Sequence, residues 1–468
     1  MDSINQGDIK GEVKSQDHQD GFDYPSSRSA WTAVAVLSLT YMFSLMDRQI
    51  LFLLIEPIKQ DLNITDTQVG LLTGVAFAVV YTVMGIPFGR LADLWVRKYV
   101  IIMGVSIWSV LTIVSGFSKT FTHLFFARMG VGLGEAGLTA PAYATIADLF
   151  PPKKLAFAMS IFVLGGSIGS ALSMLLGGMA IGFVESLGSV SLPWLGELQP
   201  WRLVLIIVGL ASLLVVIPLA LMVEPKRHGK VARKETDREG GALSEDQPLS
   251  LVEVLLYLYR KRNFYGFFIL AVVLNAVIAY GAAVWMPSYF IRLHDWDPAS
   301  IGISLGLVTL FPVVLGGLAA GKMIDYFYQQ GHKDAAIRLM LLVGPLLLLS
   351  LSMFVYIPLV SLKFVAVAVY YFFSSMYAAV FPTVIQIATP MPIRAQTSAM
   401  ILFIVNLIGM GLGPASIAFV TDYIFHDELA VGRSIFYVGL VSFSLSILAF
   451  WRVIKPFNRQ LANVVEDG

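Results

Sequence analysis

The sequence predicts an all-α membrane protein with twelve membrane-spanning helices in two halves of six. Three observations support this fold class: an excess of apolar residues, apolar segments long enough to cross a bilayer, and a repeat that relates the two halves. Hydrophobic residues make up 57% of the 468 residues and charged residues 13%, whereas soluble domains carry about 25% charged residues. This deficit of charge indicates an integral membrane protein rather than a large soluble core.

Twelve apolar segments follow one another along the chain, each long enough to cross the bilayer core as a helix, which takes about 20 residues. A stretch rich in Lys, Arg, Asp and Glu, 224–262, follows the sixth segment and indicates a solvated linker. The weakly polar stretch 186–200 predicts a loop with a short helix. The apolar segments have the approximate limits 31–56, 67–89, 98–118, 121–146, 156–184, 201–223, 264–291, 299–322, 335–358, 361–389, 394–421 and 433–456.

These segments divide the chain into two bundles, a linker and two tails. The first 30 residues are polar and charged, so they predict a disordered tail without a cleavable signal peptide. Residues 458–468 form the second predicted tail. The two six-helix bundles then cover 31–223 and 263–457 on either side of the linker.

The distribution of Lys and Arg predicts the orientation of the chain, because cytoplasmic loops carry an excess of these residues. With the N-terminus inside, 24 of the 32 Lys and Arg residues lie in the tails and loops of that side, and six lie outside. We therefore expect both termini in the cytoplasm. We further expect a monomer in a bacterial inner membrane.

The two halves of the chain repeat each other. Residues 89–93, Gly-Arg-Leu-Ala-Asp, follow the second segment, and residues 321–325, Gly-Lys-Met-Ile-Asp, follow the eighth at an offset of 232. Further matches at an offset of 241 relate Pro141 to Pro382 and Phe162 to Phe403. A duplicated six-helix unit is typical of secondary transporters whose binding site lies between the halves.

Four ionisable residues interrupt the apolar segments of the first half. Asp47 and Arg48 are neighbours in the first segment, and Arg128 and Glu135 share one face of the fourth, about 10 Å apart. Such groups cost roughly 2.5–3.5 kcal/mol each at the centre of a membrane helix and usually mark a transport pathway. A static set of ion pairs that joins two helices remains the alternative interpretation.

If the first and fourth helices are neighbours, these residues form one cluster of balanced charge. A carboxylic acid in apolar surroundings can exchange a proton near neutral pH, whereas Arg stays charged. We therefore predict that Asp47 and Glu135 carry protons, and that Arg48 and Arg128 bind an anionic phosphate or carboxylate. Whether Asp47 pairs with Arg48 or with Arg128 is open at this point.

The second half lacks these charges and offers hydroxyl, amide and aromatic groups among apolar residues. A charged wall facing such a wall suits an amphiphile better than a sugar, which needs polar groups on both sides. Plain packing explains the aromatic residues equally well. The candidate substrate contacts are Asn275, Tyr280, Tyr370, Ser374 and Tyr377.

The loop 89–98, Gly-Arg-Leu-Ala-Asp-Leu-Trp-Val-Arg-Lys, resembles the signature of the major facilitator superfamily between helices 2 and 3. The resemblance implies the fold of that superfamily and a latch between the halves in the outward-open state. Leu94 and Val96 replace the usual basic residue and glycine, so the latch is expected to differ here. A role of Arg97 and Lys98 in orientation alone remains open. The candidate gate residues are Gly89, Arg90, Asp93, Arg97, Lys98, Asp148, Gly321 and Asp325.

Three segments are similar to the spinster family of lipid transporters. They are residues 41–48 (YMFSLMDR), residues 85–89 (GIPFG) running into 97–99 (RKY), and residues 128–136 (RMGVGLGEA) with 147–150 (ADLF). This resemblance implies transport of lysophospholipids or lipids of the sphingosine-1-phosphate class. The in-membrane charges add the expectation of alternating access coupled to protons.

Other functions are weighed against this prediction. Proton symport of a small organic acid, such as an aromatic carboxylate, would use the same charges. A polytopic lipid-modifying enzyme would need a His/Asp metal cluster or an activated Ser. The chain has no Cys, and its six His lie in predicted tails, loops or helix ends. We therefore expect no catalytic residue, metal or cofactor, and as partners an amphipathic substrate, protons and membrane lipid, but no nucleic acid.

Overall fold

The computed structural model describes residues 24–188, 190–192, 196–225 and 251–466. Residues 1–23 of the predicted tail and 226–250 of the predicted linker lie outside the described residues. Helices account for nearly all of the described chain, and the predicted all-α fold class is confirmed.

The first half of the chain contains the helices α1 to α10 and a small hairpin. The elements are α1 (Ser27–Leu53), α2 (Ile55–Leu62), α3 (Asp66–Gly70), the π-helical segment η1 (Leu71–Val75), α4 (Ala76–Leu94), α5 (Arg97–Gly116), α6 (Phe121–Glu135), α7 (Thr139–Leu149), α8 (Pro152–Ser186), β1 (Val190–Leu192), β2 (Gly196–Leu198), α9 (Pro200–Leu214) and α10 (Val216–Leu221).

The second half repeats this pattern with longer helices. The elements are α12 (Leu251–Arg260), α13 (Arg262–His294), α14 (Pro298–Gln329), α15 (Ala335–Tyr356), α16 (Val360–Ala388), α17 (Met391–Val405), the π-helical segment η2 (Asn406–Met410), α18 (Gly411–Phe419), the π-helical segment η3 (Val420–Phe425), the 3-10 turn η4 (Glu428–Ala430) and α19 (Val431–Glu466).

Eleven described segments are long and apolar enough to cross a membrane. The remaining predicted span, 121–146, consists of α6 and α7, which are separated by a turn at 136–138. Several helices extend beyond their predicted limits because hydropathy marks only the part in contact with hydrocarbon. Thus α19 continues to Glu466, and α12 occupies the end of the predicted linker.

The prediction of a short helix between 186 and 200 is wrong. This stretch forms a two-stranded antiparallel hairpin in which Val190 pairs with Leu198 and Leu192 with Gly196. Val190 and Leu192 alternate with Ser191, the period-2 pattern of a strand, but the run is too short for hydropathy to resolve.

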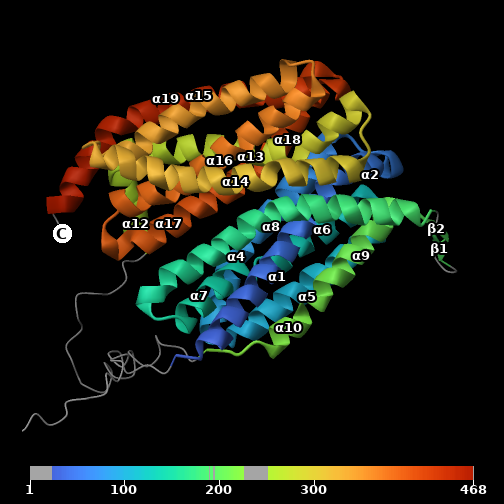
Figure 1. The fold of residues 1–468 in the computed structure, drawn as a ribbon, viewed down its shortest axis with the longest axis horizontal. Helices are drawn as coiled ribbons and strands as arrows, with labels where there is room; N and C mark the ends of the chain where they lie inside the picture. Colours follow the sequence, from blue (N-terminus) through green and yellow to red (C-terminus); the bar gives the residue numbers. More distant parts are fainter. Residues whose placement is uncertain (1–23, 189, 193–195, 226–250, 467–468) are drawn as a thin grey trace, which may run out of the picture.

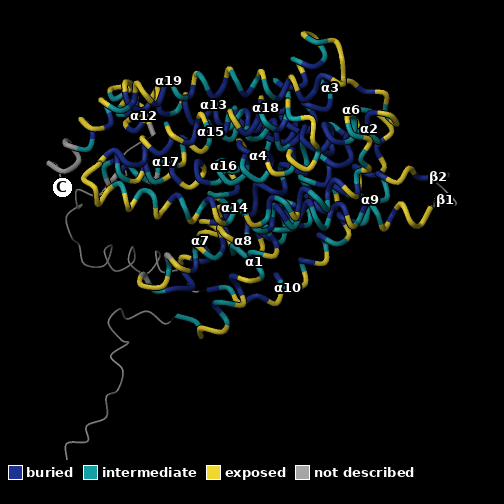
Figure 2. The backbone as a smooth tube through the Cα atoms, turned by 45° about the horizontal axis from the view of Figure 1, so that its top comes forward, coloured by how far each residue is buried: buried dark blue, intermediate teal, exposed yellow. Residues whose placement is uncertain are grey.

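The two halves form two bodies that lie side by side (Figure 1). The helices α8 and α14 pack against each other across their boundary. We call the end where α1 begins and α19 ends the terminal end, and the opposite end, with α2 and the hairpin, the far end. Buried residues follow the inner faces of both bodies, and exposed residues recur along the outer helices (Figure 2).

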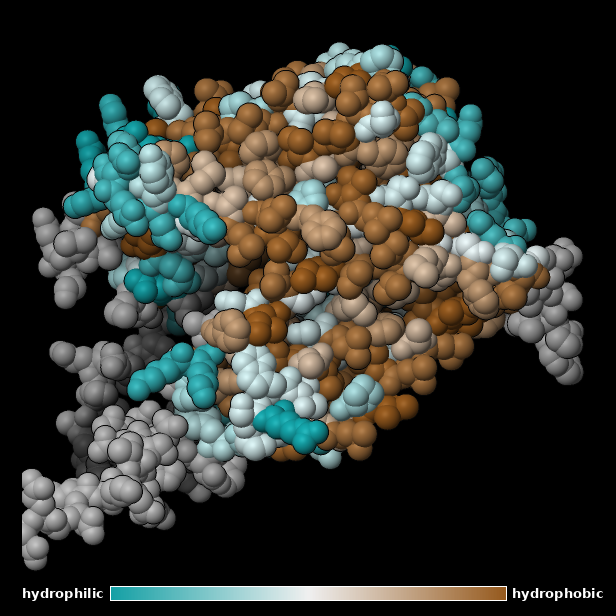
Figure 3. All heavy atoms as spheres, in the orientation of Figure 1, coloured by the Kyte–Doolittle hydropathy of each residue, from teal (hydrophilic) through white to brown (hydrophobic). Residues whose placement is uncertain are grey.

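Hydrophobic side chains cover the middle of the visible surface, and hydrophilic ones gather toward its two ends (Figure 3). Large hydrophobic side chains are exposed along the helices, among them Phe311 and Leu315 on α14 and Leu214 on α9. In a soluble protein so large an apolar patch would be a liability. In a bilayer it is the surface that contacts lipid.

Candidate functional site

The four charged residues of the first half lie together and form two ion pairs. Arg48 Nε donates to Glu135 Oε2 at 2.6 Å, and Nη2 of the same guanidinium lies 2.6 Å from that oxygen. Arg128 Nη1 lies 3.3 Å from Asp47 Oδ2. The structure thus answers the question that the sequence left open, because Asp47 pairs with Arg128 and not with its neighbour in the chain.

Helix geometry explains why Asp47 pairs with Arg128 while its neighbour Arg48 pairs with Glu135. Consecutive residues of an α-helix point about 100° apart around the axis, so the side chains of Asp47 and Arg48 leave α1 in different directions. Asp47 faces α5 and α6, and Arg48 faces α6 and the aromatic rings of α4. Gly132 and Gly134 let α6 pack closely against α4 and α5. A methyl group on Gly134, for example, would lie 2.5 Å from the backbone nitrogen of Trp108 in α5.

Two hydroxyl groups complete the cluster. Thr112 Oγ1 donates to Asp47 Oδ1 at 2.6 Å, and Ser44 Oγ donates to Glu135 Oε2 at 2.5 Å. Both oxygens of Asp47 therefore have a partner. Glu135 Oε1 is buried and has no hydrogen-bond partner among the described residues. The two acids, equivalent in the sequence, are inequivalent in the structure.

The four charged residues also differ in how far they are exposed. Asp47, Arg128 and Glu135 are at most 2% exposed, whereas the side chain of Arg48 is 16% exposed. Its guanidinium lies over the rings of Phe77 and Tyr81, with 4.5 and 4.7 Å to the ring centroids. Arg48 is therefore the most accessible charge of the cluster.

The second-half candidates are spread over several environments. Tyr280 packs against the core cluster of the first half, and its hydroxyl donates to Asn406 Oδ1 at 3.3 Å. Tyr370 is buried, and its hydroxyl has no partner in the described part of the chain. The hydroxyl of Tyr377 donates to the Ala271 carbonyl oxygen at 3.3 Å. Asn275 is buried and Ser374 is half-buried.

Among these candidates, Tyr280 lies beside the half that holds the charges. The hydrogen bond of Tyr377 joins α16 to α13 within the second half, which packing alone explains. The role of all five in substrate binding stays a prediction.

Two of the candidate gate residues, Arg97 and Lys98, contact their own half. Arg97 Nη1 forms an ion pair with Asp148 Oδ2 and also donates to the Ala144 carbonyl oxygen at 2.8 Å. Lys98 Nζ donates to the carbonyl oxygens of Ala220 and Met222 at the end of α10, at 3.2 and 3.0 Å. Asp93 has interaction partners as well, whereas Arg90 and, in the second half, Gly321 and Asp325 are exposed.

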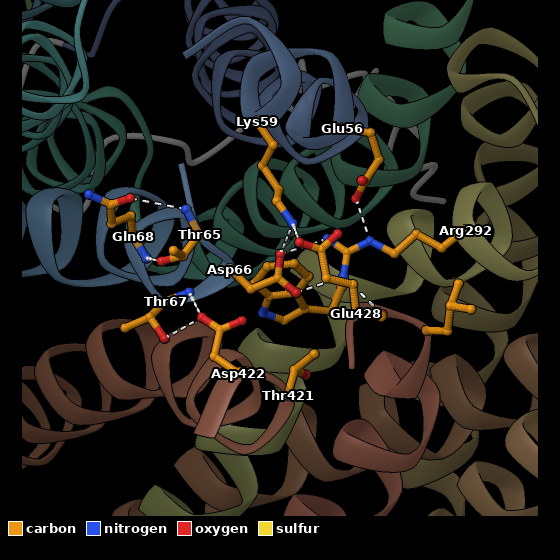
Figure 4. A network of polar contacts seen from close by, with 12 residues as sticks. Glu56, Lys59, Thr65, Asp66, Thr67, Gln68, Arg292, Thr421, Asp422 and Glu428 are labelled. Atoms are coloured by element: carbon orange, nitrogen blue, oxygen red, sulfur yellow. Dashed lines mark hydrogen bonds and ion pairs between the residues drawn. The ribbon is translucent and has the colours of Figure 1, made fainter. Parts of the chain in front are cut away.

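A second charged network, which the sequence did not reveal, joins the two halves at the far end (Figure 4). Arg292 on α13 binds both oxygens of Asp66 at 2.6 and 2.7 Å and Glu56 Oε1 at 2.8 Å. Lys59 forms ion pairs with Asp66 and, at 3.0 Å, with Glu428. We call these five residues the far-end network.

A neighbouring contact reinforces it. Asp422 in η3 accepts hydrogen bonds from the backbone nitrogen and hydroxyl of Thr67, at 2.7 and 2.6 Å. It therefore holds the first turn of α3 against the opposite half. Lys59 and Arg292 are two of the six Lys and Arg residues that the predicted orientation places outside. Hydropathy carries no information on which loops meet, so the sequence does not predict their contacts.

Repeat-related glycines show that the halves touch at the far end and separate toward the terminal end. Gly70 and Gly74 face the opposite half closely, since a methyl group on Gly74 would lie 2.5 Å from the Gly411 carbonyl oxygen. Their equivalents at the offset of 232, Gly302 and Gly306, do the same, with 2.6 Å from a methyl group on Gly306 to the Leu175 nitrogen.

The next two pairs of glycines related by the offset of 232 behave differently. At Gly85 and Gly89 in α4, and at their equivalents Gly317 and Gly321 in α14, the described residues place no atom within 4 Å of the position that a methyl group would take, apart from the backbone next to each glycine in its own helix. The surface is hollowed between the two bodies toward the terminal end (Figure 3). The molecule is thus closed at the far end and open between the halves at the terminal end.

Comparison with known proteins identifies the family. The family model of the Major Facilitator Superfamily matches residues 37–414. The chain belongs to the major facilitator superfamily. As a member, it is a membrane transporter, and the predicted resemblance to this superfamily is confirmed.

Several curated relatives of the superfamily align over most of the chain. An MFS-type efflux pump of Mycolicibacterium smegmatis is 27% identical over 94% of this chain and 96% of its own length. Protein spinster homolog 1 of Xenopus tropicalis is 28% identical over 85% of this chain and 74% of its own. The hexuronate transporter of Bacillus subtilis is 24% identical over 94% and 99%. Spinster proteins are thus among the relatives, as predicted.

Solved structures of the superfamily share the fold. A bacterial homologue of the human lysosomal transporter Spinster, in an inward-facing and unoccupied conformation, superposes with a TM-score of 0.71 and 24% identity, covering 95% of this chain and 99% of the other. A D-xylose-proton symporter superposes with a TM-score of 0.64 and 14% identity, covering 91% and 97%.

Loss of the Arg292 guanidinium is expected to open the far end. Arg292→Ala leaves Asp66 and Glu56 without their partner from the opposite half, and breaking a buried ion pair costs about 3–5 kcal/mol. Because the chain has no Cys, Ala299→Cys on α14 is a single reporter at the far-end boundary, next to Gly178 of α8. A membrane-impermeant maleimide should label it faster in the Arg292→Ala background.

Arg433→Ala is the matched control, since Arg433 lies at the same end but pairs with Asp427 within its own half, at 3.4 Å. Equal labelling rates in the Arg292→Ala and Arg433→Ala backgrounds would contradict a role of Arg292 in closing the far end.

Proposed function

We propose that this protein is a proton-coupled transporter that moves an anionic, lipid-like amphiphile of the lysophospholipid or sphingosine-1-phosphate class by alternating access. The observation that carries the proposal is the pair between Arg48 and Glu135, in which a buried carboxylate occupies the most accessible cation of the cluster.

The pair couples the binding of a proton to the binding of an anion. A proton that arrives at Glu135 neutralises the carboxylate and releases Arg48 from its ion pair. The guanidinium can then bind a phosphate or carboxylate head group through two parallel hydrogen bonds. When the head group leaves and the proton is lost, Glu135 pairs with Arg48 again. Proton and substrate are thereby linked through one cation.

The pair between Asp47 and Arg128 supports a different role for its members. Both carboxylate oxygens of Asp47 are taken, by Thr112 and Arg128. Arg128 is 2% exposed. We therefore assign proton exchange to Glu135 and head-group binding to Arg48, and retain Asp47 and Arg128 as the pair that fixes α1 against α6.

The surroundings of Arg48 favour an amphiphile. Phe77 and Tyr81 lie against its guanidinium, and Tyr41 stacks on Phe162 with 5.4 Å between ring centroids. Phe and Tyr both supply a large apolar area, and Tyr adds a polar hydroxyl group at its tip. A charged head group at Arg48 with an apolar tail along these rings fits this composition.

The open terminal end supports an inward-facing state. The excess of Lys and Arg in the tails and loops of that end makes it the cytoplasmic side under the positive-inside rule. The bacterial Spinster homologues with TM-scores of 0.71 and 0.68 were solved in inward-facing conformations. We accordingly assign both termini to the cytoplasm and the protein to a bacterial inner membrane.

A second candidate substrate is a small sugar acid. The names of several relatives favour it, among them the hexuronate transporter of Bacillus subtilis at 24% identity. A carboxylate could occupy Arg48 as well as a phosphate does. The polyol part of such a substrate would need several polar partners, whereas Phe77, Tyr81 and Tyr41 surround this position.

Uptake into proteoliposomes distinguishes the candidates. We expect fluorescent lysophosphatidylglycerol to enter faster under a pH gradient, as measured after albumin removes the outer-leaflet probe, and to be recovered chemically unchanged. Arg48→Ala should reduce this uptake to the level of protein-free liposomes, and Arg338→Ala, which removes an exposed cation on α15, should not. Uptake of labelled glucuronate or benzoate without lysolipid uptake would overturn the lipid assignment.

A further inference from the structure

Ser44 contacts the proton-exchanging carboxylate and has no role in the function proposed so far. It lies on α1 four residues before Arg48, so both side chains project from the same face of the helix. Ser44 Oγ and Arg48 Nε reach the same atom, Glu135 Oε2, at 2.5 and 2.6 Å. Ser44 is 1% exposed, so water does not compete for this hydrogen bond.

The two donors at Oε2 leave one position for a proton. Oε2 accepts from a hydroxyl and from a guanidinium, whereas Oε1 has no partner among the described residues. A proton that binds Glu135 therefore goes to Oε1. Once it is bound, Oε2 becomes a neutral carbonyl oxygen, and the hydrogen bond from Ser44 loses the strength that an ionised acceptor confers.

We propose that Ser44 is a positioning residue that sets the pH at which Glu135 exchanges its proton. This inference rests on the proton coupling proposed above and adds the group that regulates it. The hydroxyl favours the ionised carboxylate and so opposes proton uptake. Without it, Glu135 should hold its proton to a higher pH.

Other charges around Glu135 do not substitute for Ser44. Arg48 and Asp47 face it from α1, and Arg128 lies on α6 itself. From α4, Tyr81 approaches through the guanidinium of Arg48. The side chain that α5 contributes to the cluster is the uncharged Thr112, which donates to Asp47. Ser44 is thus the neutral donor to Glu135 in the described structure.

The test is the pH profile of lysophosphatidylglycerol uptake between pH 5 and 9. Loss of one hydrogen bond to a charged acceptor should move the midpoint of the profile by about one pH unit toward alkaline pH in Ser44→Ala. Ser44→Thr keeps the hydroxyl and should restore the wild-type midpoint. If Ser44→Ala fails to fold, Ser44→Cys, whose thiol is a weaker donor, should shift the midpoint in the same direction by less.

Thr40→Ala is the matched control. Thr40 lies one turn earlier on α1, is fully buried, and donates to the Val36 carbonyl oxygen of its own helix at 2.8 Å. Its loss removes a buried hydroxyl without touching the cluster and should leave the midpoint unchanged.

The outcomes separate this inference from the proposed function. If wild-type uptake depends on pH, Glu135→Gln abolishes that dependence, and the Ser44→Ala profile coincides with wild type, Ser44 has no regulatory role and the coupling stands. If wild-type uptake does not depend on pH, the coupling itself fails. An equal shift in Thr40→Ala would also refute the specific role of Ser44.

Discussion

Glu135→Gln is expected to abolish the pH dependence of transport. The amide has nearly the shape of the protonated acid, but it can neither take up nor release a proton. Arg48 then stays permanently free of its carboxylate partner, so the exchange of one substrate molecule for another continues while uptake driven by a proton gradient stops. The buried donors Ser44 and Arg48 can still reach the amide oxygen at the place of Oε2, so we expect a stability loss of only about 1–3 kcal/mol.

Two assays in the same proteoliposomes check this result. Counterflow of lysophosphatidylglycerol should persist at every pH, and gradient-driven uptake should fall to the background. Glu185→Gln on α8 is the control, because it neutralises an exposed carboxylate away from the cluster. A Glu135→Gln protein with the pH profile of wild type would remove Glu135 from the proton-exchanging role.

The sequence predicted the members of this site because burial of charge leaves a strong signal. Asp47, Arg48, Arg128 and Glu135 interrupt long apolar segments, and the structure brings all four together. The sequence could not predict which acid pairs with which arginine. Partner choice depends on how α1 is rotated against α5 and α6, and this rotation is determined by packing, as at Gly134 against Trp108.

Inequivalence of the two acids is likewise a tertiary effect. Thr112 lies on a different helix from Asp47, and nothing in the spacing of the residues connects them. Their hydrogen bond of 2.6 Å gives Asp47 Oδ1 a partner, whereas Oε1 of Glu135 has no partner among the described residues. Hydroxyl residues are common in apolar segments, so Ser44 and Thr112 carry no signal before the helices are packed.

The far-end network escaped prediction for a different reason. Its members lie at helix ends and loops, where charged residues are ordinary and the hydropathy pattern gives no information on contacts. Arg292 and Asp66 are 226 residues apart, and they meet only because the two halves close against each other. Tyr377 shows a related limit, since its aromatic character predicts a ligand contact while the hydrogen bond of its hydroxyl joins two helices of one half, and the packing of these helices explains that bond equally well.

Leucine in place of Gly85 and Gly317 is expected to stop transport by blocking closure of the terminal end. In the described part of the chain, no atom other than the adjacent helix backbone lies within 4 Å of a methyl position at either glycine, so the present state leaves room for larger side chains. Leucine also favours a helix by nearly 1 kcal/mol over glycine, and the double variant should fold normally.

The glycines that precede them on the same two helices define what closure requires. Where the halves touch, a methyl group would lie 2.9 Å from Ala415 at Gly70 and 2.8 Å from Gly178 at Gly302, so only glycine permits the contact. Alternating access requires the terminal end to close when the far end opens. Gly85 lies on the same membrane span as Gly70, and Gly317 on the same span as Gly302. When the terminal end closes, Gly85 and Gly317 should therefore lie as close to the opposite half.

Binding and labelling locate the block. In Gly85→Leu/Gly317→Leu, lysophosphatidylglycerol should still bind from the terminal end, but uptake should vanish, and Ala299→Cys should stay protected from the maleimide even with substrate present. Gly266→Leu is the matched control, since Gly266 also faces open space but lies on α13, outside the glycine positions that repeat between α4 and α14. Wild-type uptake by the double variant would mean that the terminal end closes by a contact other than the one used at the far end.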